Sequence, residues 1–242
     1  MTIPELERYD HCRLDRLLPH QIRECLAENP TIYIPLGTVE WHSEHLPIGL
    51  DALTAEGLCL RVANRIGGLV YPVLHYGTGG GHGAYPWTVM LSDHDSLERM
   101  LRFTLTRLSE FGVRKALLFS GHFPDEQLAM IDRLAADWSA ANSAMHVVAS
   151  AVNRIPGLDL APDHAGLFET TLLYGLHPEL VAENRLPQKK SGETEADPYG
   201  AQRHEPRHPL WGIFGPDPRG FDKTKAQPLV EAIIGHLVGL MV

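Results

Sequence analysis

The sequence predicts an α/β fold in which helices cover both faces of a mainly parallel central sheet. Strand-like and helix-like segments alternate along the chain, as they do in folds built from strand–helix–strand units. The strand-like segment Ile32–Leu36 is almost continuously apolar, which is typical of a strand buried on both faces. The chain has 242 residues, of which 44% are apolar. This composition is enough for the core of one domain spanning residues 1–242.

The first half of the chain is expected to alternate two helices with two strands. A helix over Pro19–Asn29 carries its proline in the first turn, where a missing N–H costs little. A second helix, Ala52–Ile66, has apolar residues at helical spacing and ends at Gly67-Gly68. The expected strands are Ile32–Leu36 and Leu69–His75, and a glycine-rich loop, Gly77–Gly83, follows the second one.

The second half continues the alternation. Ser92 and Asp95 are candidate caps of a long helix that runs to Phe111 and stops at Gly112. The polar, proline-rich segment Gln188–Pro209 is expected to form a surface loop or lid. The remaining elements are the strands Lys115–Ser120 and His146–Val152 and the helices Asp125–Ala140, Ala165–Leu176 and Gln227–Met241.

Charge and hydropathy argue against several classes of partner. The net charge is −9 and no Lys/Arg cluster stands out, so we expect no nucleic-acid partner. No apolar run reaches the roughly 18 residues of a membrane span, and the N-terminus lacks a signal pattern. A cytoplasmic protein is therefore predicted. Cys12, Cys25 and Cys59 are far apart, which favours neither a disulfide framework nor a thiolate metal site.

Side chains able to bind a metal follow the ends of three expected strands. Glu40 and His42 come shortly after the first strand, and His82 and His122 follow later strands. Ligands bind beyond the carboxyl ends of parallel strands, so these side chains are expected to converge. Asp51 is compatible both with a metal ligand and with the N-cap of the next helix. The sequence favours a metal site over a set of satisfied loop residues.

A further cluster contains Asp163, His164 and Glu169. If a helix begins near Ala165, His164 lies at its start and Glu169 lies one turn in. Two interpretations remain open, namely a metal-linked site and a structural N-cap with an outward-facing glutamate. The loop Gly77–Gly83 lacks the Lys-Ser/Thr ending of a nucleotide-binding loop, and there is no G-x-S-x-G motif.

These residues resemble the ordered motifs of the creatininase (creatinine amidohydrolase) family of metal-dependent amide hydrolases. Pro35–Asp51 resembles the signature P-x-G-x-x-E-x-H-G-x-H-L-P-x-x-x-D. Gly81–Thr88 is similar to H-x-x-(F/Y)-P-G-T, and Gly121-His122 to the start of G-H-G-G-N. His164–Thr170 matches H-A-G-x-x-E-T, and Trp211–Pro218 is similar to the closing G-x-x-G-x-P.

The resemblance implies a three-layer α/β/α sandwich, a homo-oligomer that is often a hexamer, and two divalent metal ions per chain (Zn, Mn or Fe). It implies His164 as the proton shuttle, with Asp163 orienting it, while His82 and His45 are alternatives for the shuttle. The implied metal ligands are Glu40, His42, Asp51, His122 and Glu169, with Asp51 bridging the two ions. The substrate-binding candidates are His82, Tyr85, Trp87 and Phe123.

Two departures from the family pattern affect the expected substrate. Trp87 replaces the glycine of P-G-T, and Phe123-Pro124-Asp125 replaces G-G-N. Creatininase has a glutamate ligand where this chain has Pro124, so the ligand role is assigned to Glu169 and creatinine is not the expected substrate.

The function predicted from the sequence is hydrolysis of the C–N bond of a small non-peptide amide, either a cyclic amide or a formamide, by a metal-activated water. Three alternatives stay open. They are a metal-dependent lactonase or dehydratase, a non-catalytic small-ligand-binding protein, and a subunit whose main role is assembly.

Overall fold

The chain folds into three layers around a parallel β-sheet. The computed structural model describes residues 5–141, 144–193 and 197–242. Within them the strand order is β2-β1-β3-β4, and every neighbouring pair is parallel. The four strands are β1 (Thr31–Leu36), β2 (Leu69–Val70), β3 (Lys115–Ser120) and β4 (His146–Ala151). The predicted fold class is confirmed.

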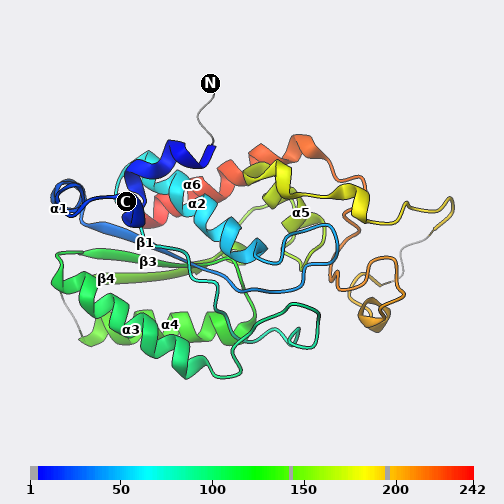
Figure 1. Cartoon of the computed structure of the whole chain (residues 1–242), viewed down its shortest axis with the longest axis horizontal. Coiled ribbons are helices and arrows are strands. Elements are labelled where there is room, and N and C mark those ends of the chain that lie inside the picture. Colours follow the sequence, from blue (N-terminus) through cyan, green and yellow to red (C-terminus); the bar gives the residue numbers. More distant parts are fainter. Residues whose placement is uncertain (1–4, 142–143, 194–196) are drawn as a thin grey trace.

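Helices cover both faces of this sheet, as Figure 1 shows. One face carries α2 (Leu50–Ile66), α5 (Leu167–Leu176) and α6 (Ala226–Met241). The other face carries α3 (His94–Glu110) and α4 (Asp125–Ala141), while α1 (Pro19–Glu28) lies at the end of the sheet where β1 begins. No helix among the described residues is long and apolar enough to cross a membrane.

Each face of the sheet has its own hydrophobic core. Tyr33 and Phe119 point from β1 and β3 toward α2, α5 and α6, where they pack with residues such as Leu58 and Phe168. Their sequence neighbours on the strands point to the opposite face, because side chains alternate along a strand. Ile32, Ile34 and Leu118 accordingly pack against α3 and α4. The sheet is buried on both faces, in agreement with the apolar character of its strands.

Three element boundaries differ by two residues or more from those expected, and the others agree within one or two residues. The strand expected over Leu69–His75 is regular only at Leu69–Val70, because Pro72 has no N–H to continue the ladder, although Leu74 still bonds to Pro35. α2 begins at Leu50, so Asp51 lies in its first turn and is not its N-cap. α5 begins at Leu167 because Ala165 has a φ of +56°, which is incompatible with a right-handed helix.

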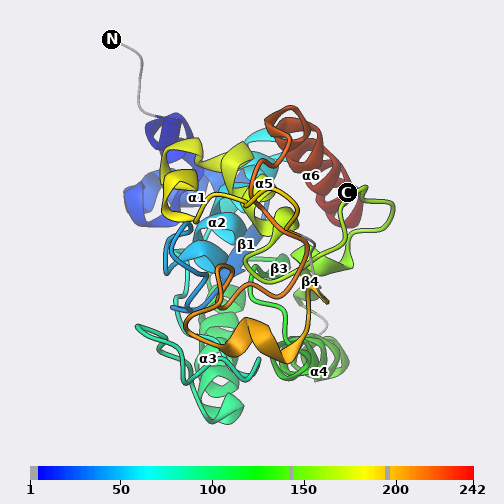
Figure 2. The same ribbon diagram turned by 90° about the vertical axis from the view of Figure 1, so that its right-hand side faces the viewer.

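Two glycines bring the start of α2 against the carboxyl ends of β1 and β3. A Cβ on Gly37 would lie 2.2 Å from the backbone nitrogen of Ala52, and one on Gly121 would lie 2.0 Å from the carbonyl oxygen of Asp51. Only glycine permits such close approach of two backbones. Asp51 is thereby held between the ends of two central strands. Figure 2 looks onto this end of the sheet, where the connecting loops gather.

Candidate metal centre

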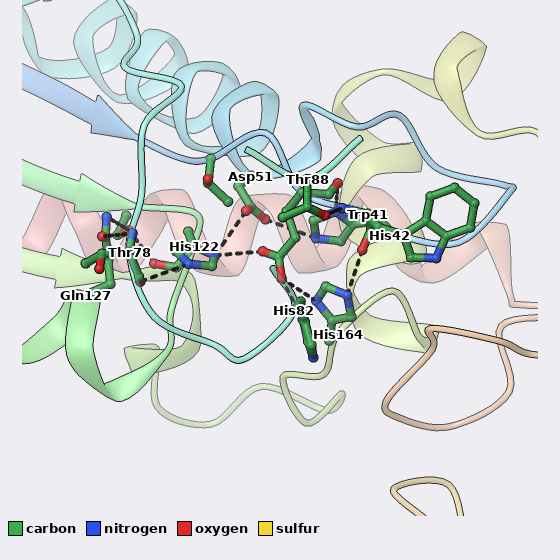
Figure 3. A network of polar contacts seen from close by, with 12 residues as sticks. Trp41, His42, Asp51, Thr78, His82, Thr88, His122, Gln127 and His164 are labelled. Atoms are coloured by element: carbon green, nitrogen blue, oxygen red, sulfur yellow. Dashed lines mark hydrogen bonds and ion pairs between the residues drawn. The ribbon is translucent and has the colours of Figure 1, made fainter. Parts of the chain in front are cut away.

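All five predicted ligands meet at the carboxyl ends of the strands. Glu40 and His42 lie in the loop that leaves β1, Asp51 in the first turn of α2, His122 just after β3 and Glu169 in α5. Each of these five residues is 4% exposed or less. Figure 3 shows His42, Asp51 and His122 turned toward one another, with His82 and His164 beside them. The sequence therefore identified side chains that the fold brings together.

Asp51 lies between two groups of potential ligands. Its Oδ2 is 3.2 Å from Nδ1 of His122, which in turn is 2.9 Å from Oε2 of Glu40. Its Oδ1 is 3.2 Å from Nε2 of His42, which is 3.5 Å from Oε2 of Glu169. In each group, Glu40–Asp51–His122 and His42–Asp51–Glu169, one ligand atom per residue lies within 4.8 Å of the others. Asp51 is common to these two groups, and a third group, Glu40–His42–His164, lies equally close together.

Backbone carbonyls determine which imidazole nitrogen faces the carboxylates. Nδ1 of His42 lies 2.9 Å from the carbonyl oxygen of Glu40, and Nε2 of His122 lies 3.2 Å from that of Thr78. A carbonyl oxygen only accepts, so these nitrogens carry hydrogen and the opposite nitrogens are the ones free to coordinate. Metal-binding histidines are commonly oriented in this way.

The residues present fit a divalent metal ion. His42 Nε2 and Asp51 Oδ2 are buried without a well-directed hydrogen bond to any described residue. A buried polar atom left unpaired costs about 1–3 kcal/mol, which coordination of a cation would recover. Imidazole nitrogen and carboxylate oxygen suit zinc, manganese and iron alike. The residues of the ligand cluster therefore fit a divalent metal ion.

In the protein without metal, the pKa values of the cluster show how protons balance the charge of the buried carboxylates. Burial opposes a charged imidazole, but the carboxylates of Asp51 and Glu169 raise the pKa of His42 to about 10. Burial is likewise outweighed at His122, where Asp51 and Glu40 raise the pKa to about 10. Burial together with the charge of Asp51 raises the pKa of Glu169 well above its usual value, against the opposing effect of His42. Protons thus balance the carboxylates when no metal does.

His82 and His164 form a second row of imidazoles around Glu40. His82 Nδ1 is 2.6 Å from Glu40 Oε1, and His164 Nδ1 is 3.9 Å from the same oxygen. His164 Nε2 lies 3.0 Å from the carbonyl oxygen of Trp41, so this nitrogen carries hydrogen and Nδ1 keeps its lone pair. Burial and the charge of His42 lower the pKa of His164 to about 3, so the ring is neutral.

Asp163 holds the beginning of α5. Its carboxylate accepts hydrogen bonds from the backbone N–H groups of Gly166, Phe168 and Glu169. Gly166 occupies the N-cap position of α5, so Asp163 is not the N-cap that the sequence offered as an alternative, although its side chain caps the same N–H groups from three residues earlier. Glu169, in contrast, is buried and faces the ligand cluster, so its side chain does not point outward. Orientation of His164 by Asp163 stays a prediction.

A cavity of about 250 Å³ opens onto the ligand cluster. Its wall includes two predicted substrate-binding residues, His82 and Phe123. The other two lie elsewhere: Tyr85 O–H lies 2.9 Å from Nδ1 of His204, and Trp87 is 81% exposed. The residues that line the cavity are Glu40, Asp51, Gly80, His82, His122, Phe123, Pro124, His164 and Glu169.

An aromatic cluster that was not predicted from the sequence covers His82. Phe214 stacks on the His82 ring with the ring centres 5.1 Å apart, and Tyr85 meets His82 edge-on at 5.6 Å. Trp211 and His204 continue this cluster around Tyr85 and Phe214. Phe214 and Trp211 belong to the segment Trp211–Pro218, which the sequence identified only as a motif.

The segment Gln188–Pro209, expected to be a loop or lid, lies outside the described residues at 194–196, and its described part includes a short 3₁₀ helix at Ala201–His204. Arg203 in this helix is 1% exposed, and its guanidinium donates to the carbonyl oxygen of Ile213. This part of the segment is therefore anchored in the protein next to the aromatic cluster. Opening and closing of the segment stays a prediction.

Comparison with known proteins identifies relatives of this chain. Creatinine amidohydrolase of Pseudomonas putida is 28% identical over 183 residues, which span 66% of this chain and 69% of that protein. Mycofactocin precursor peptide peptidase of Mycobacterium ulcerans (strain Agy99) is 29% identical over 173 residues, or 65% of this chain and 62% of that protein.

Solved structures show the same fold. The crystal structure of creatinine amidohydrolase (creatininase) superposes with a TM-score of 0.74 at 24% identity, covering 95% of this chain and 96% of the other. Solved structures of creatininase also include one described as "Creatininase Mn" and a mutant described as "Zn-Zn type".

The family model described as creatinine amidohydrolase matches residues 16–241, which is nearly the whole chain. The match includes all five residues of the ligand cluster and the segment that carries Phe214. The chain therefore belongs to the creatininase family of amidohydrolases.

Proposed function

We propose that this protein is a metal-dependent amidohydrolase that cleaves the C–N bond of a small non-peptide amide. The observation that carries the proposal is the position of Asp51 between two groups of ligands, each with one further carboxylate and one imidazole. Two divalent ions per chain would be held by Glu40, Asp51 and His122 and by His42, Asp51 and Glu169. Creatininase structures of manganese and Zn-Zn type support the choice of ions.

Divalent ions held in this cluster would supply Lewis acidity toward the substrate carbonyl and the attacking water. The chain's own residues hold them in place. Glu40 keeps Oε2 toward His122 while Oε1 accepts from His82. Hydrogen bonds of this kind to ligand carboxylates and imidazoles fix their orientation.

His164 is suited to move the proton. Its ring is neutral and its Nδ1 lone pair lies on the cavity side, beside Glu40. In the proposed reaction Nδ1 takes a proton from the attacking water as the new C–O bond forms. The same nitrogen then gives this proton to the leaving nitrogen as the C–N bond breaks. General acid–base catalysis of this type contributes roughly 10²–10⁴-fold to the rate.

The proposed substrates are cyclic amides and formamides. A cavity of about 250 Å³ next to the ligand cluster suits a small molecule. Phe123 and Pro124 supply apolar surface on its wall, and His82 also belongs to this wall. Tyr85 and Trp87 would contact the part of the substrate that extends out of the cavity. Replacing Trp87 with glycine is then expected to raise KM more than it lowers kcat.

The first test measures metal content by elemental analysis. Purified wild type and Asp51→Asn are reloaded with zinc, manganese or iron and desalted before measurement. About two ions per wild-type chain, with loss of both from Asp51→Asn, are expected because Asp51 belongs to both groups. Glu44→Gln is the matched control, since Glu44 is an exposed acid in the same loop and its replacement should leave metal content unchanged.

The second test screens the loaded enzyme against cyclic amides, formamides and lactones. Turnover of amides that disappears with chelation and returns with metal supports the proposal. A wild-type protein that stays free of metal after reloading would refute it and favour a binding role. Turnover of lactones alone would place the protein in another class of hydrolase.

We also propose that the protein forms a homo-oligomer, as the family resemblance implies. Large apolar side chains on the surface, including Phe103 and Phe111, support an association of chains. Light scattering coupled to size-exclusion chromatography measures the assembly directly. A mass that corresponds to six chains is expected, whereas a monomer at working concentration would contradict the proposal. A cytoplasmic location stays a prediction from the sequence.

A further inference from the structure

The ring of His82 is held by its contacts and not by regular secondary structure. His82 lies in a loop that includes Gly79, Gly80 and Gly81, all with positive φ. Its Nδ1 reaches Glu40 Oε1 at 2.6 Å, a short charge-assisted hydrogen bond. One face of the ring stacks on Phe214, with an angle of 15° between the two planes. These two contacts fix where the ring lies and which way Nδ1 points.

Phe214 itself is fixed by the backbone next to the site. Its N–H donates to the carbonyl oxygen of His164 at 2.8 Å, and its carbonyl oxygen accepts from the N–H of His164 at 2.9 Å. The neighbouring Ile213 carbonyl accepts from the buried guanidinium of Arg203. These hydrogen bonds hold Phe214 in a fixed position next to His164. The loop that carries His82 does not take part in this pairing of Phe214 and His164.

We propose that Phe214 is a positioning residue that holds the His82 imidazole against Glu40. With Oε1 occupied by His82, Glu40 can turn only Oε2 toward His122 and the first ligand group. Loss of the stacking surface would free the His82 ring and, through it, the plane of the Glu40 carboxylate. The link from Glu40 to metal affinity rests on the proposed function, but the link from Phe214 to His82 does not.

The first experiment observes the His82–Glu40 hydrogen bond in metal-free protein. Histidine labelled with ¹⁵N gives a downfield Nδ1–H signal for a bond this short, and the signal is assigned by its loss in His82→Asn. Phe214→Leu, and Phe214→Met as a second variant with an unbranched side chain, are expected to broaden or lose this signal. Phe214→Tyr keeps the ring face and should retain the signal.

Phe221→Leu is the matched control. Phe221 is a buried phenylalanine that packs on Tyr174, with ring centres 5.3 Å apart, and does not contact His82. A merely structural effect of losing an aromatic ring would appear equally in this variant. If folded Phe214→Leu or Phe214→Met keeps the His82 signal unchanged, the proposal is wrong. Loss of the signal in Phe221→Leu as well would also overturn it.

The second experiment measures metal affinity by competition with a chromophoric chelator. Removing a group that orients a metal ligand typically weakens binding 10–100-fold. We expect roughly tenfold weaker binding for Phe214→Leu, a similar or larger loss for His82→Asn, and no additional loss when both are combined. Equal affinity in wild type and Phe214→Leu would overturn the role toward Glu40. A wild type that binds no metal would refute the proposed function and leave the NMR result standing.

Discussion

His164 differs from the two histidines of the ligand cluster because it is neutral although carboxylates lie nearby. His42 and His122 each lie within 3.5 Å of two carboxylates, which stabilise their charged forms. His164 is held 3.9 Å from its nearest carboxylate oxygen, and its ring packs against His42 with centres 4.4 Å apart. A difference in distance and in neighbours thus separates a side chain suited to coordination from one suited to proton transfer.

Replacing His164 should therefore separate turnover from metal binding. His164→Ala is expected to retain both ions, since His164 belongs to neither of the two groups that share Asp51. Loss of the proton shuttle should lower kcat roughly 10²–10⁴-fold. Elemental analysis and steady-state kinetics of the same preparation check both statements. Loss of one ion together with activity would instead make His164 a ligand, as its place beside Glu40 and His42 also permits.

The convergence of three candidate ligands could be predicted from the sequence, but the choice between the two interpretations of Asp163 could not. Glu40, His42 and His122 follow strand ends, and parallel strands bring their carboxyl ends together whatever the details of packing. Asp163 depends on where α5 begins, and that is decided by the left-handed backbone at Ala165. The contact of Phe214 could not be predicted because its partner His82 lies 132 residues earlier and no local pattern links them.

At the scale of elements, the site depends on how closely α2 approaches the sheet. Gly121 follows β3, and its N–H donates to the carbonyl oxygen of Leu36 at the end of β1. The absence of a side chain at Gly121 lets the first turn of α2 enter the space above both strands. Asp51 reaches both ligand groups only from this position.

Gly121→Ala is expected to displace Asp51 and weaken metal binding, although Gly121 is not one of the candidate ligands. The new Cβ would lie 2.0 Å from the carbonyl oxygen of Asp51, so α2 must move. Overpacking of this kind costs typically 1–3 kcal/mol or more, and the moved Asp51 should bind metal more weakly. Chemical denaturation and metal competition measure the two effects. Gly83→Ala is the control, because a Cβ there meets nothing within 4 Å; equal effects of the two substitutions would contradict the argument.

A partly buried ion pair joins the loop of Glu193 to the loop of Asp217 and Arg219. Arg219 donates two hydrogen bonds from Nε and one from NH2 to the Asp217 carboxylate, and it also bonds to Glu193. Although burial opposes ionisation, the Arg219 guanidinium holds the pKa of Asp217 below its usual value. A carboxyl whose pKa is lower in the folded protein stabilises the fold above its unfolded pKa of about 4.

This contribution should be lost as the pH falls below about 4. The free energy of unfolding of wild type is expected to exceed that of Asp217→Asn by a constant amount between about pH 5 and 7, on the order of 1–3 kcal/mol. The difference should shrink on further acidification, as Asp217 takes up its proton. Urea denaturation at a series of pH values measures it. A difference that grows toward low pH would show that the pKa of Asp217 is raised and not lowered.

At the scale of the whole molecule, alternation of strands and helices was sufficient to predict the layers. A parallel strand requires a crossover connection, and helices of this length placed between apolar strands leave few other arrangements. The exact extent of β2 was not predictable, since Leu74 bonds to Pro35 beyond the break at Pro72. The oligomer was implied by resemblance alone, because a surface that contacts another chain has no required local pattern.

The metal centre should also govern the stability of the whole molecule. Its five ligands come from the loop after β1, from α2, from the segment after β3 and from α5, so ions bound there connect both halves of the chain. Ions that bind the folded but not the unfolded chain stabilise it by RT ln(1 + [L]/Kd), about 2.7 kcal/mol at 100 times Kd. The Tm of wild type should therefore rise with metal concentration and fall after chelation. Asp51→Asn should show no such shift at the same protein concentration, and an equal shift in both proteins would mean that the ions bind elsewhere.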